Sequence, residues 1–337
     1  MADFNVNHIT GKQGQQGTVL AGVTTMSSTG SMRIPSGPTE QRGGRGRGVM
    51  LNISNPGLTT VNNYITIATT GNALDFGDQS LARYSKGGFA SATRGFDAGG
   101  STPTNQTTIE YVTISSQGGG NNFGDLTVAR AYCGGASNAT RGIVAGGGNP
   151  VLQNLIDYVT MATTGDASDF GDLTLARTYM SGAGCQSPTR GLFAGGHPMT
   201  TNLIDYVTIA TTGNATEFGN LTLSRSGISA GSNATRGIFA GGSTPSPNTG
   251  YNVIDYVTMA TTGNAIDFGD ATMTGFRWMG AGMYSATRGV HAGGYPAVNT
   301  IQYITIATTG NAADFGDATG GISNSANSSD VHGGLGD

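Results

Sequence analysis

The chain is built from a repeated unit. A strand-like run of the form Tyr-(Val/Ile)-Thr-(Ile/Met) occurs six times, and successive copies begin 47, 47, 48, 50 and 47 residues apart. The copies begin at Tyr64, Tyr111, Tyr158, Tyr206, Tyr256 and Tyr303. A period of this size indicates a repeat architecture, in which each unit buries its faces only against its neighbours.

Each repeat contains four short segments rich in β-branched and aromatic residues, separated by Gly, Asn, Asp and Ser. The Tyr run is followed by a Phe-Gly sequence, then by a Leu-Thr-Leu-Ala-Arg run (clearest at 173–177), and then by an Arg-Gly run that ends in a double glycine (141–147). Four strands per unit predict an all-β propeller of six four-stranded antiparallel blades. We expect the Arg-Gly run nearest the axis, the Tyr run as a middle strand, and the Asp-Phe-Gly-Asp sequence as a turn.

The two ends of the chain depart from the repeat. A last, partial copy of the Arg-Gly run, which we call the 330–334 echo, occurs at the carboxyl end. It predicts that this end completes the first blade and removes an exposed sheet edge. Residues 46–337 then form the propeller, with seven blades as the alternative if amino-terminal residues contribute strands. Residues 1–45 are rich in Gly, Ser and Thr and predict an extended arm.

Composition excludes several classes of partner. The chain has 58 glycines, 11% charged residues and a net charge of −4, so nothing favours binding to nucleic acid or to an anionic membrane. No apolar run approaches the roughly 20 residues that span a bilayer, and the first residues lack the features of a secretory signal. We expect Cys133 and Cys185 to be small buried residues rather than a disulfide.

No residue pattern predicts catalysis. The four histidines, at 8, 197, 291 and 332, are scattered without metal-ligand spacing, and the glycine runs lack the spacing of a nucleotide loop. The acidic pairs of the Asp-Phe-Gly-Asp type, such as Asp75 and Asp78, leave calcium binding open as an alternative to a turn. We therefore expect no enzyme activity, no cofactor and no bound metal.

Binding is the more plausible role, because the connections that follow each double glycine vary most between repeats. The aromatic candidates for stacking on a sugar or gripping a protein are Trp278, Tyr295 and Tyr251. The alternative is that these aromatics fill a locally wider blade.

Two features of the repeat resemble kelch repeats: the double glycine that closes a hydrophobic strand, and the arginine at Arg83, Arg130, Arg177 and Arg225. The kelch tryptophan is absent, so the resemblance is to a kelch-like repeat. It covers residues 47–335.

More narrowly, the near-identical Tyr-Val-Thr-Ile-Ala-Thr-Thr-Gly-Asn repeats resemble those of structural proteins of marine tailed phages, especially cyanophages. Segments 4–10, 35–39 and 42–47 resemble an amino-terminal segment shared by such proteins. This resemblance implies a non-enzymatic virion protein, made in the host cytoplasm and located in the particle. It also implies that the protein is attached to other virion proteins through residues 1–45. The arm residues expected to bind are Phe4, Val6, Ile9, Arg45 and Arg47.

The resemblance leaves the place in the virion open between capsid decoration, neck, tail and fibre. A lectin-like adhesin that recognises a host surface glycan or protein is the alternative function. A propeller glycosidase is less favoured, because it needs a pair of carboxylates that converge near the axis.

Overall fold

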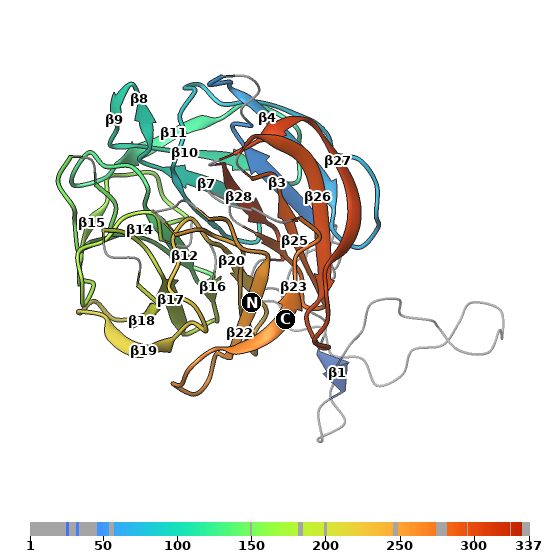
Figure 1. The fold of residues 1–337 in the computed structure, drawn as a ribbon. Coiled ribbons are helices and arrows are strands. Elements are labelled where there is room, and N and C mark those ends of the chain that lie inside the picture. Colours follow the sequence, from blue (N-terminus) through green and yellow to red (C-terminus); the bar gives the residue numbers. More distant parts are fainter. Residues whose placement is uncertain are drawn as a thin grey trace.

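Six antiparallel sheets surround a common centre in the computed structural model (Figure 1). The structure describes residues 46–53, 57–148, 150–180, 185–198, 201–244, 249–273, 282–294, 296–323 and 325–331, and strands β1 (Thr25–Met26) and β2 (Met32–Arg33). Each of the six sheets has four strands, which confirms the predicted six-bladed propeller. Within residues 1–45 the structure describes only β1 and β2, which pair antiparallel.

The blades follow one another along the chain, and the four strands of each blade lie side by side from the centre outward. Blade 1 contains β28 (Ala326–Ser329), β3 (Arg47–Leu51), β4 (Val61–Thr66) and β5 (Leu74–Asp78). Blade 2 contains β6 (Gly87–Ala90), β7 (Arg94–Ala98), β10 (Thr108–Thr113) and β11 (Asn121–Asp125), with a small hairpin of β8 (Ser101–Thr102) and β9 (Thr104–Asn105). Blade 3 contains β12 (Gly134–Ser137), β13 (Arg141–Ala145), β14 (Leu155–Thr160) and β15 (Ser168–Asp172).

The other three blades have the same plan. Blade 4 contains β16 (Cys185–Gln186), β17 (Arg190–Ala194), β18 (Leu203–Thr208) and β19 (Thr216–Asn220). Blade 5 contains β20 (Ser229–Ser232), β21 (Arg236–Ala240), β22 (Val253–Thr258) and β23 (Ile266–Asp270). Blade 6 contains β24 (Met283–Tyr284), β25 (Arg288–Ala292), β26 (Val298–Thr305) and β27 (Ala313–Ile322).

The Arg-Gly run lies one strand further from the axis than the sequence predicted. The Arg-Gly run is the second strand of each blade, and the innermost strand is the short small-residue segment before it, such as β6 or β12. These segments can approach closely because they lack bulk: a Cβ on Gly135 would collide with the backbone of Gly88 in the neighbouring blade. The Leu-Thr-Leu-Ala-Arg run is not a strand and instead connects one blade to the next.

The Asp-Phe-Gly-Asp sequence is the outermost strand rather than a turn. Its glycine has a positive φ, for example +142° at Gly171, and the register with the third strand shifts at this point. The shift is a β-bulge, which gives a strand the glycine and acidic composition that is typical of a turn. The turn prediction for this sequence is therefore wrong, although the count of four strands per repeat is right.

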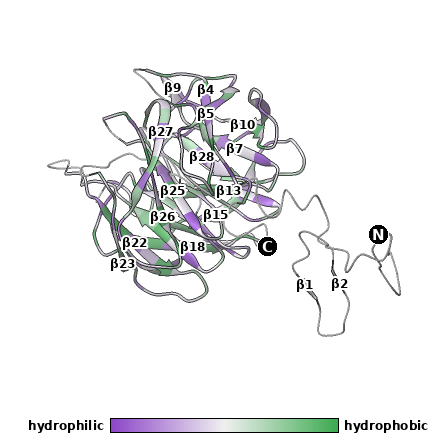
Figure 2. Cartoon of the chain, turned by 90° about the vertical axis from the view of Figure 1, so that its right-hand side faces the viewer, coloured by the Kyte–Doolittle hydropathy of each residue, from purple (hydrophilic) through white to green (hydrophobic). Residues whose placement is uncertain are grey.

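The core lies between the blades. Its buried side chains form six clusters, and each draws on adjacent blades. Leu192 and Ile204 of blade 4, for instance, share a cluster with Phe239 and Val257 of blade 5. Hydrophobic residues accordingly occur on strands throughout the propeller in Figure 2 rather than in one region. An isolated blade would leave both faces exposed to water, so the blades stabilise each other.

The ring is closed by pairing between distant parts of the sequence. β28 pairs antiparallel with β3, from Ala326 opposite Leu51 to Ser329 opposite Gly48. The closing strand therefore precedes the 330–334 echo that we expected to close the ring. Asp330 still contributes, because its side chain accepts a hydrogen bond from the Arg47 N–H at 2.9 Å.

Candidate functional site

The loops of the propeller lie on two faces. The crossover face carries the connections between second and third strands (99–107 in blade 2) and the crossovers to the next blade (126–133). Antiparallel bridges join the two kinds of loop at Tyr84–Ser101, Ala131–Gly148, Thr178–His197 and Ser226–Ser243. The turn face carries the turns between first and second strands (91–93) and the loops between third and fourth strands (114–120). The connections that vary most between repeats therefore lie on the crossover face.

Six arginines join neighbouring blades on the turn face. Arg94 begins the second strand of blade 2, and its guanidinium carbon lies 4.5 Å from the centroid of the Tyr111 ring. The same guanidinium donates a 2.9 Å hydrogen bond to the carbonyl of Met161 in blade 3. The equivalent arginines are Arg47, Arg141, Arg190, Arg236 and Arg288. Because these guanidinium groups are stacked on tyrosines and hydrogen-bonded within the propeller, their first role is structural. We call these six arginines the arginine ring.

A belt of loops covers the outer sheet edges. The third-to-fourth loop of each blade lies along the outermost strand of the blade before it: Gly165 donates its N–H to the carbonyl of Phe123 at 2.9 Å, and Ala167 to that of Asp125 at 2.8 Å. A Cβ on Gly124 would collide with the carbonyl of Gly165, and the corresponding glycine of every outer strand has the same type of neighbour. The repeated Thr-Gly-Asn and Phe-Gly-Asp sequences are thus matched parts of one interblade contact, which protects edge strands from pairing with other chains.

Buried ion pairs lie beneath the crossover face. Arg177 is fully buried, and its Nη2 is 2.9 Å from Oδ2 of Asp205. Its other hydrogen bonds reach the carbonyls of Gly195, Leu203 and Phe193 at 2.8, 3.0 and 3.1 Å. Burial lowers the pKa of Arg177, and the Asp205 carboxylate opposes that effect. The equivalent pairs are Arg83–Glu110, Arg130–Asp157 and Arg225–Asp255.

Two blades replace the whole ion pair. Where the third strand has Gln302 or Asn63 instead of an acid, the arginine position holds Gly275 or Ile322. The Asn63 Oδ1 accepts hydrogen bonds from the N–H and Oγ1 of Thr319 at 2.9 and 2.8 Å, as the Asp205 carboxylate does from Thr174. The two charges therefore occur together or not at all. This is expected if either charge alone is costly to bury.

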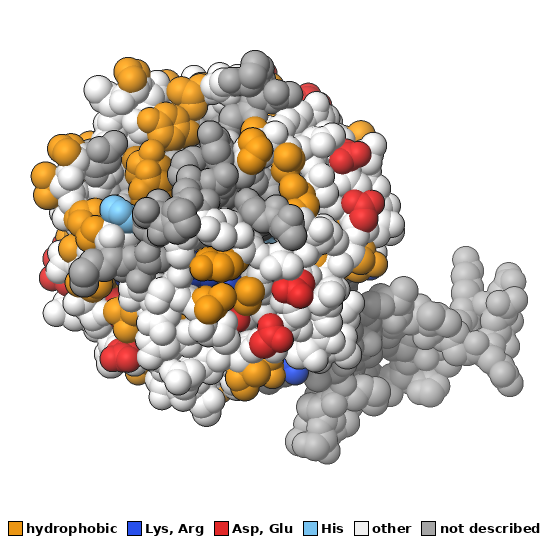
Figure 3. All heavy atoms as spheres, viewed as in Figure 1, with side chains coloured by type: hydrophobic (Ala, Val, Ile, Leu, Met, Phe, Trp, Pro, Cys, Tyr) orange, Lys and Arg blue, Asp and Glu red, His pale blue; other side chains and the backbone are white. Residues whose placement is uncertain are grey.

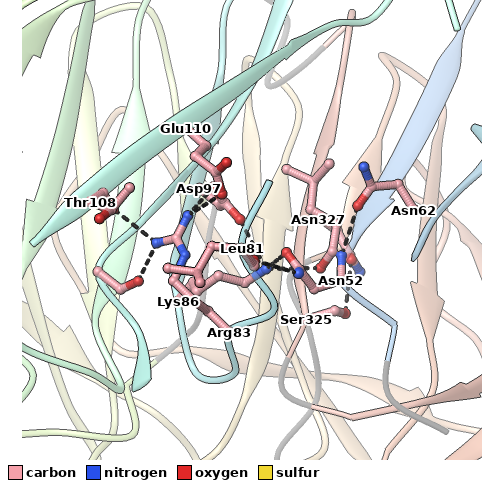
Figure 4. A network of polar contacts seen from close by, with 12 residues as sticks. Asn52, Asn62, Leu81, Arg83, Lys86, Asp97, Thr108, Glu110, Ser325 and Asn327 are labelled. Carbon is pink, nitrogen blue, oxygen red and sulfur yellow. Dashed lines mark hydrogen bonds and ion pairs between the residues drawn. The ribbon is translucent and has the colours of Figure 1, made fainter. Parts of the chain in front are cut away.

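Blade 2 adds a second cation to its pair. Lys86 is buried, and its Nζ lies 2.9 Å from Oδ2 of Asp97 and donates to the Leu51 carbonyl and to the Asn52 side chain of blade 1 (Figure 4). Burial lowers the pKa of Lys86 to about 8, although Asp97 opposes this. Burial in turn raises the pKa of Asp97, but Arg83 and Lys86 outweigh it and hold that pKa below its ordinary value. The two cations and two carboxylates of this network balance in charge. The contacts of Lys86 with Leu51 and Asn52 connect blade 2 to blade 1.

Three tyrosines form an arc on the crossover face. Tyr84, Tyr132 and Tyr179 belong to three successive crossovers and are half-buried. The ring centroids of Tyr132 and Tyr179 are 3.9 Å apart, and those of Tyr84 and Tyr132 are 6.3 Å apart. The ring of His197 lies 6.3 Å beyond Tyr179. We call Tyr84, Tyr132 and Tyr179 the tyrosine arc.

The chain matches no protein-family model, and a search of curated proteins finds no similar sequence.

The residues predicted to bind ligand fall partly outside the described structure. Trp278 and Tyr295 lie outside the described residues, as do Phe4, Val6, Ile9 and Arg45 of the arm. Tyr251 is half-buried in the second-to-third connection of blade 5, on the crossover face, and its N–H donates to the carbonyl of Gly242 at 2.9 Å. Arg47 belongs to the arginine ring and lies 4.6 Å from the centroid of the Tyr64 ring. The structure does not bring Tyr251 to the tyrosine arc.

Histidine and cysteine side chains, which are often catalytic or metal-binding in other proteins, are buried in the blades here. Both nitrogens of the His291 ring are hydrogen-bonded, Nδ1 with Ser229 Oγ at 2.8 Å and Nε2 with the Tyr284 hydroxyl at 2.7 Å. Burial lowers the pKa of His291 to about 4. The free thiols Cys133 and Cys185 are buried, and burial raises the pKa of Cys133 to about 11.

Three features are absent from the described residues. No three of their His, Cys, Asp or Glu side chains are grouped to hold a metal ion. In the same part of the chain, no helix is long and apolar enough to cross a bilayer. The described parts of the six innermost strands also contain no carboxylate of the kind that a glycosidase would require.

Sequence reasoning missed two features of this face. The tyrosine arc lies in the Leu-Thr-Leu-Ala-Arg connections, which the repeat pattern had indicated as strands. The acidic partners of the buried arginines immediately precede the repeated tyrosine, as in Asp157-Tyr158. The sequence could have revealed these pairs, because the acid is absent in the same two repeats that lack the arginine.

Proposed function

We propose that this protein is a non-enzymatic binding platform, and that it is a structural component of a tailed-phage virion. In this proposal residues 1–45 attach it to other virion proteins, and the crossover face meets a partner. The virion assignment is supported by the resemblance of its repeats and amino-terminal segment to phage structural proteins. The place within the particle stays open between capsid, neck, tail and fibre.

The observation that carries the proposal is that the arm and the variable connections reach opposite faces of the propeller. Arg47 begins β3 on the turn face, at the position where the other blades have their first-to-second turn, and Asp330 lies beside it. Residues 1–45 therefore join the propeller on the turn face. The variable connections, such as 99–107, lie on the opposite crossover face. A chain attached through its arm would present the variable loops away from the attachment point.

The repeated residues support the same division. The arginine ring, the loop belt and the buried ion pairs are all engaged in contacts within and between blades. Variation is concentrated in the second-to-third connections, which the buried arginines contact at the first glycine, as at Gly195. In repeat proteins, such per-repeat variation on one face is commonly where partners bind.

The test is complementation of a phage in which the gene for this chain carries a nonsense mutation. The host supplies either the full chain or a chain that lacks residues 1–45, and the purified particles are analysed by mass spectrometry. We expect the full chain in the particles and the shortened chain only in the soluble fraction. Circular dichroism of the shortened chain should show an unchanged melting temperature, because every blade strand begins at or after residue 47.

A matched control separates the two faces. The Tyr132→Ala chain alters the crossover face and should enter particles at the level of the unchanged chain. Recovery of the shortened chain in particles would show that the arm is not the attachment. Absence of the full chain from particles would refute the virion assignment.

A lectin-like adhesin is the second candidate, and the tyrosine arc favours it. Half-buried aromatic rings on an uncharged surface suit the apolar C–H faces of sugars. Loss of host adsorption by particles that carry Tyr132→Ala, with incorporation intact, would support this function. Unchanged adsorption would count against it.

A further inference from the structure

The tyrosine arc combines half-buried rings with an unusual backbone. Tyr132 and Tyr179 have φ values of +59° and +55°. Bulky residues rarely adopt this left-handed conformation, because the side chain crowds the neighbouring carbonyl. The equivalent residues are the buried Ser85 in blade 2, with a φ of +58°, and Gly227 in blade 5, with a φ of +66°. Only for the glycine does the conformation carry no such penalty. The fold requires a left-handed residue here but does not require a tyrosine.

Backbone hydrogen bonds explain why the conformation is fixed. The N–H of Tyr132 donates to the carbonyl of Ser85 at 2.7 Å, that of Tyr179 to Tyr132 at 3.2 Å, and that of Gly227 to Tyr179 at 2.7 Å. These bonds link successive crossovers and are independent of the side chain. Strained backbone under a partly exposed side chain is a pattern found at binding sites, where the strain is retained for function.

The described arginines beside the arc carry no unpaired charge. The arginines of the same crossovers, Arg83, Arg130 and Arg177, are fully buried and paired with carboxylates. Among the described atoms of the face seen in Figure 3, most are hydrophobic or uncharged, and acidic side chains form separate spots. The β8–β9 hairpin is bridged to Tyr84 through Ser101 and carries hydroxyl and amide groups on Thr104, Asn105 and Gln106. A ligand at the arc would meet aromatic rings and neutral hydrogen-bonding groups.

We propose that the tyrosine arc binds neutral hexose units of a glycan, with the C–H faces of the pyranose rings packed on the parts of the rings that Tyr132 and Tyr179 do not turn toward each other. This inference rests on the lectin-like form of the proposed function and assigns its site. A charged ligand would find no unpaired charge among the described crossover residues that flank the arc. Hydroxyl groups of the sugar match the hydroxyl groups of the tyrosines and of Thr104, while the Asn105 and Gln106 amides donate to the carbonyls of Gly148 and Thr104. Burial and the hydrogen bond to the Tyr132 side chain raise the pKa of Tyr179 above its ordinary value.

The blade 5 glycine supplies a sharp test. Tyr132→Gly and Tyr179→Gly remove a ring and also the backbone strain, so the melting temperature should stay within a few degrees of that of the unchanged protein. The probe is an array of neutral hexose oligosaccharides that also carries sialylated and sulfated ones, followed by calorimetry with the best neutral oligosaccharide. We expect each glycine variant to bind that oligosaccharide at least tenfold more weakly.

Two controls complete the design. Tyr179→Phe keeps the ring and should retain binding within about threefold. Ile266→Ala removes an exposed side chain from the start of β23 on the turn face and should change neither binding nor melting temperature.

Four results would overturn the inference: binding by the unchanged protein that the glycine variants keep, a preference for charged glycans, binding only to an array of proline-rich and aromatic peptides, or a large fall in melting temperature in both glycine variants. If no glycan binds at all, the site assignment fails together with the lectin function. Incorporation of the full chain into particles would then still support the virion proposal, so the two failures are distinguishable.

Discussion

Replacing Asp205 by asparagine removes one charge from a pair that is wholly buried. Arg177 would keep its three hydrogen bonds to carbonyls, but its charge would have no buried counterpart. Leaving one member of a buried pair unpartnered typically costs about 3–5 kcal/mol. Because the remaining carbonyls still solvate the guanidinium, we expect Asp205→Asn to reduce the free energy of unfolding by about 3 kcal/mol.

The reverse single change should have a similar cost. Arg177→Ile leaves the Asp205 carboxylate with the two bonds from Thr174, at 3.2 and 2.7 Å, and no cation. We expect a loss of about 3 kcal/mol here too.

The double variant Arg177→Ile with Asp205→Asn recreates the residues that the chain already uses where its last blade meets its first, Ile322 and Asn63. It should therefore cost only about 1–2 kcal/mol, since it buries no charge. The two single costs would exceed the double cost by about 4–5 kcal/mol, which is the coupling energy of the pair.

The assay is urea unfolding of the four proteins at pH 7, followed by circular dichroism. Additive losses, with the double variant about 6 kcal/mol less stable than the parent, would refute the claim that each charge is retained for the sake of the other. A loss of less than about 1 kcal/mol for Asp205→Asn would show that the buried arginine does not need its carboxylate.

Three further predictions concern the buried His291, the loops that cover the outer strands, and the strand that closes the propeller. Burial lowers the pKa of His291 to about 4 from 6.5, so the folded protein binds fewer protons than the unfolded chain between those values. Its stability should fall by about 3 kcal/mol as the pH drops through that window, and His291→Phe should show a weaker dependence in pH-resolved urea titrations. Gly124→Ala should lower the melting temperature by several degrees, because its Cβ would collide with the neighbouring loop, while Gly165→Ala, with open space around its Cβ, should not. Deleting residues 325–337 removes β28 and should abolish the cooperative thermal transition seen in calorimetry.

The sequence alone predicted the architecture because the period is a global property. Six copies of one unit fix the number of blades, whatever the role of each segment within the unit. The roles themselves were assigned less well, because composition does not separate a bulged strand from a turn. The outer strand contains glycine for the close approach of a neighbouring loop, as at Gly124, and a long-range contact of this kind leaves no local trace.

The candidate site was harder to predict for a related reason. Tyr295 and Tyr251 were selected as aromatics in variable loops, and Trp278 as part of an insertion at 276–279. The tyrosine arc is assembled from three crossovers about 47 residues apart, and each tyrosine alone resembles an ordinary residue beside an arginine. Aligning the repeats would have placed Tyr132 and Tyr179 together at the position of Gly227, but not Tyr84, which aligns with Ala131 and Thr178.

The distribution of variation among the blades separates structure from function. At positions that join blades, such as Arg94 and Gly124, all six repeats use the same residue type, because every blade presents the same neighbour to the next. The position of Tyr132 and Tyr179 has one fixed requirement, a left-handed backbone, which glycine meets at the lowest conformational cost. Two successive crossovers instead carry the residue with the larger strain and the larger exposed ring. Stability alone would favour glycine at both positions, and this added strain is the observation that supports our proposal of a binding site on the crossover face.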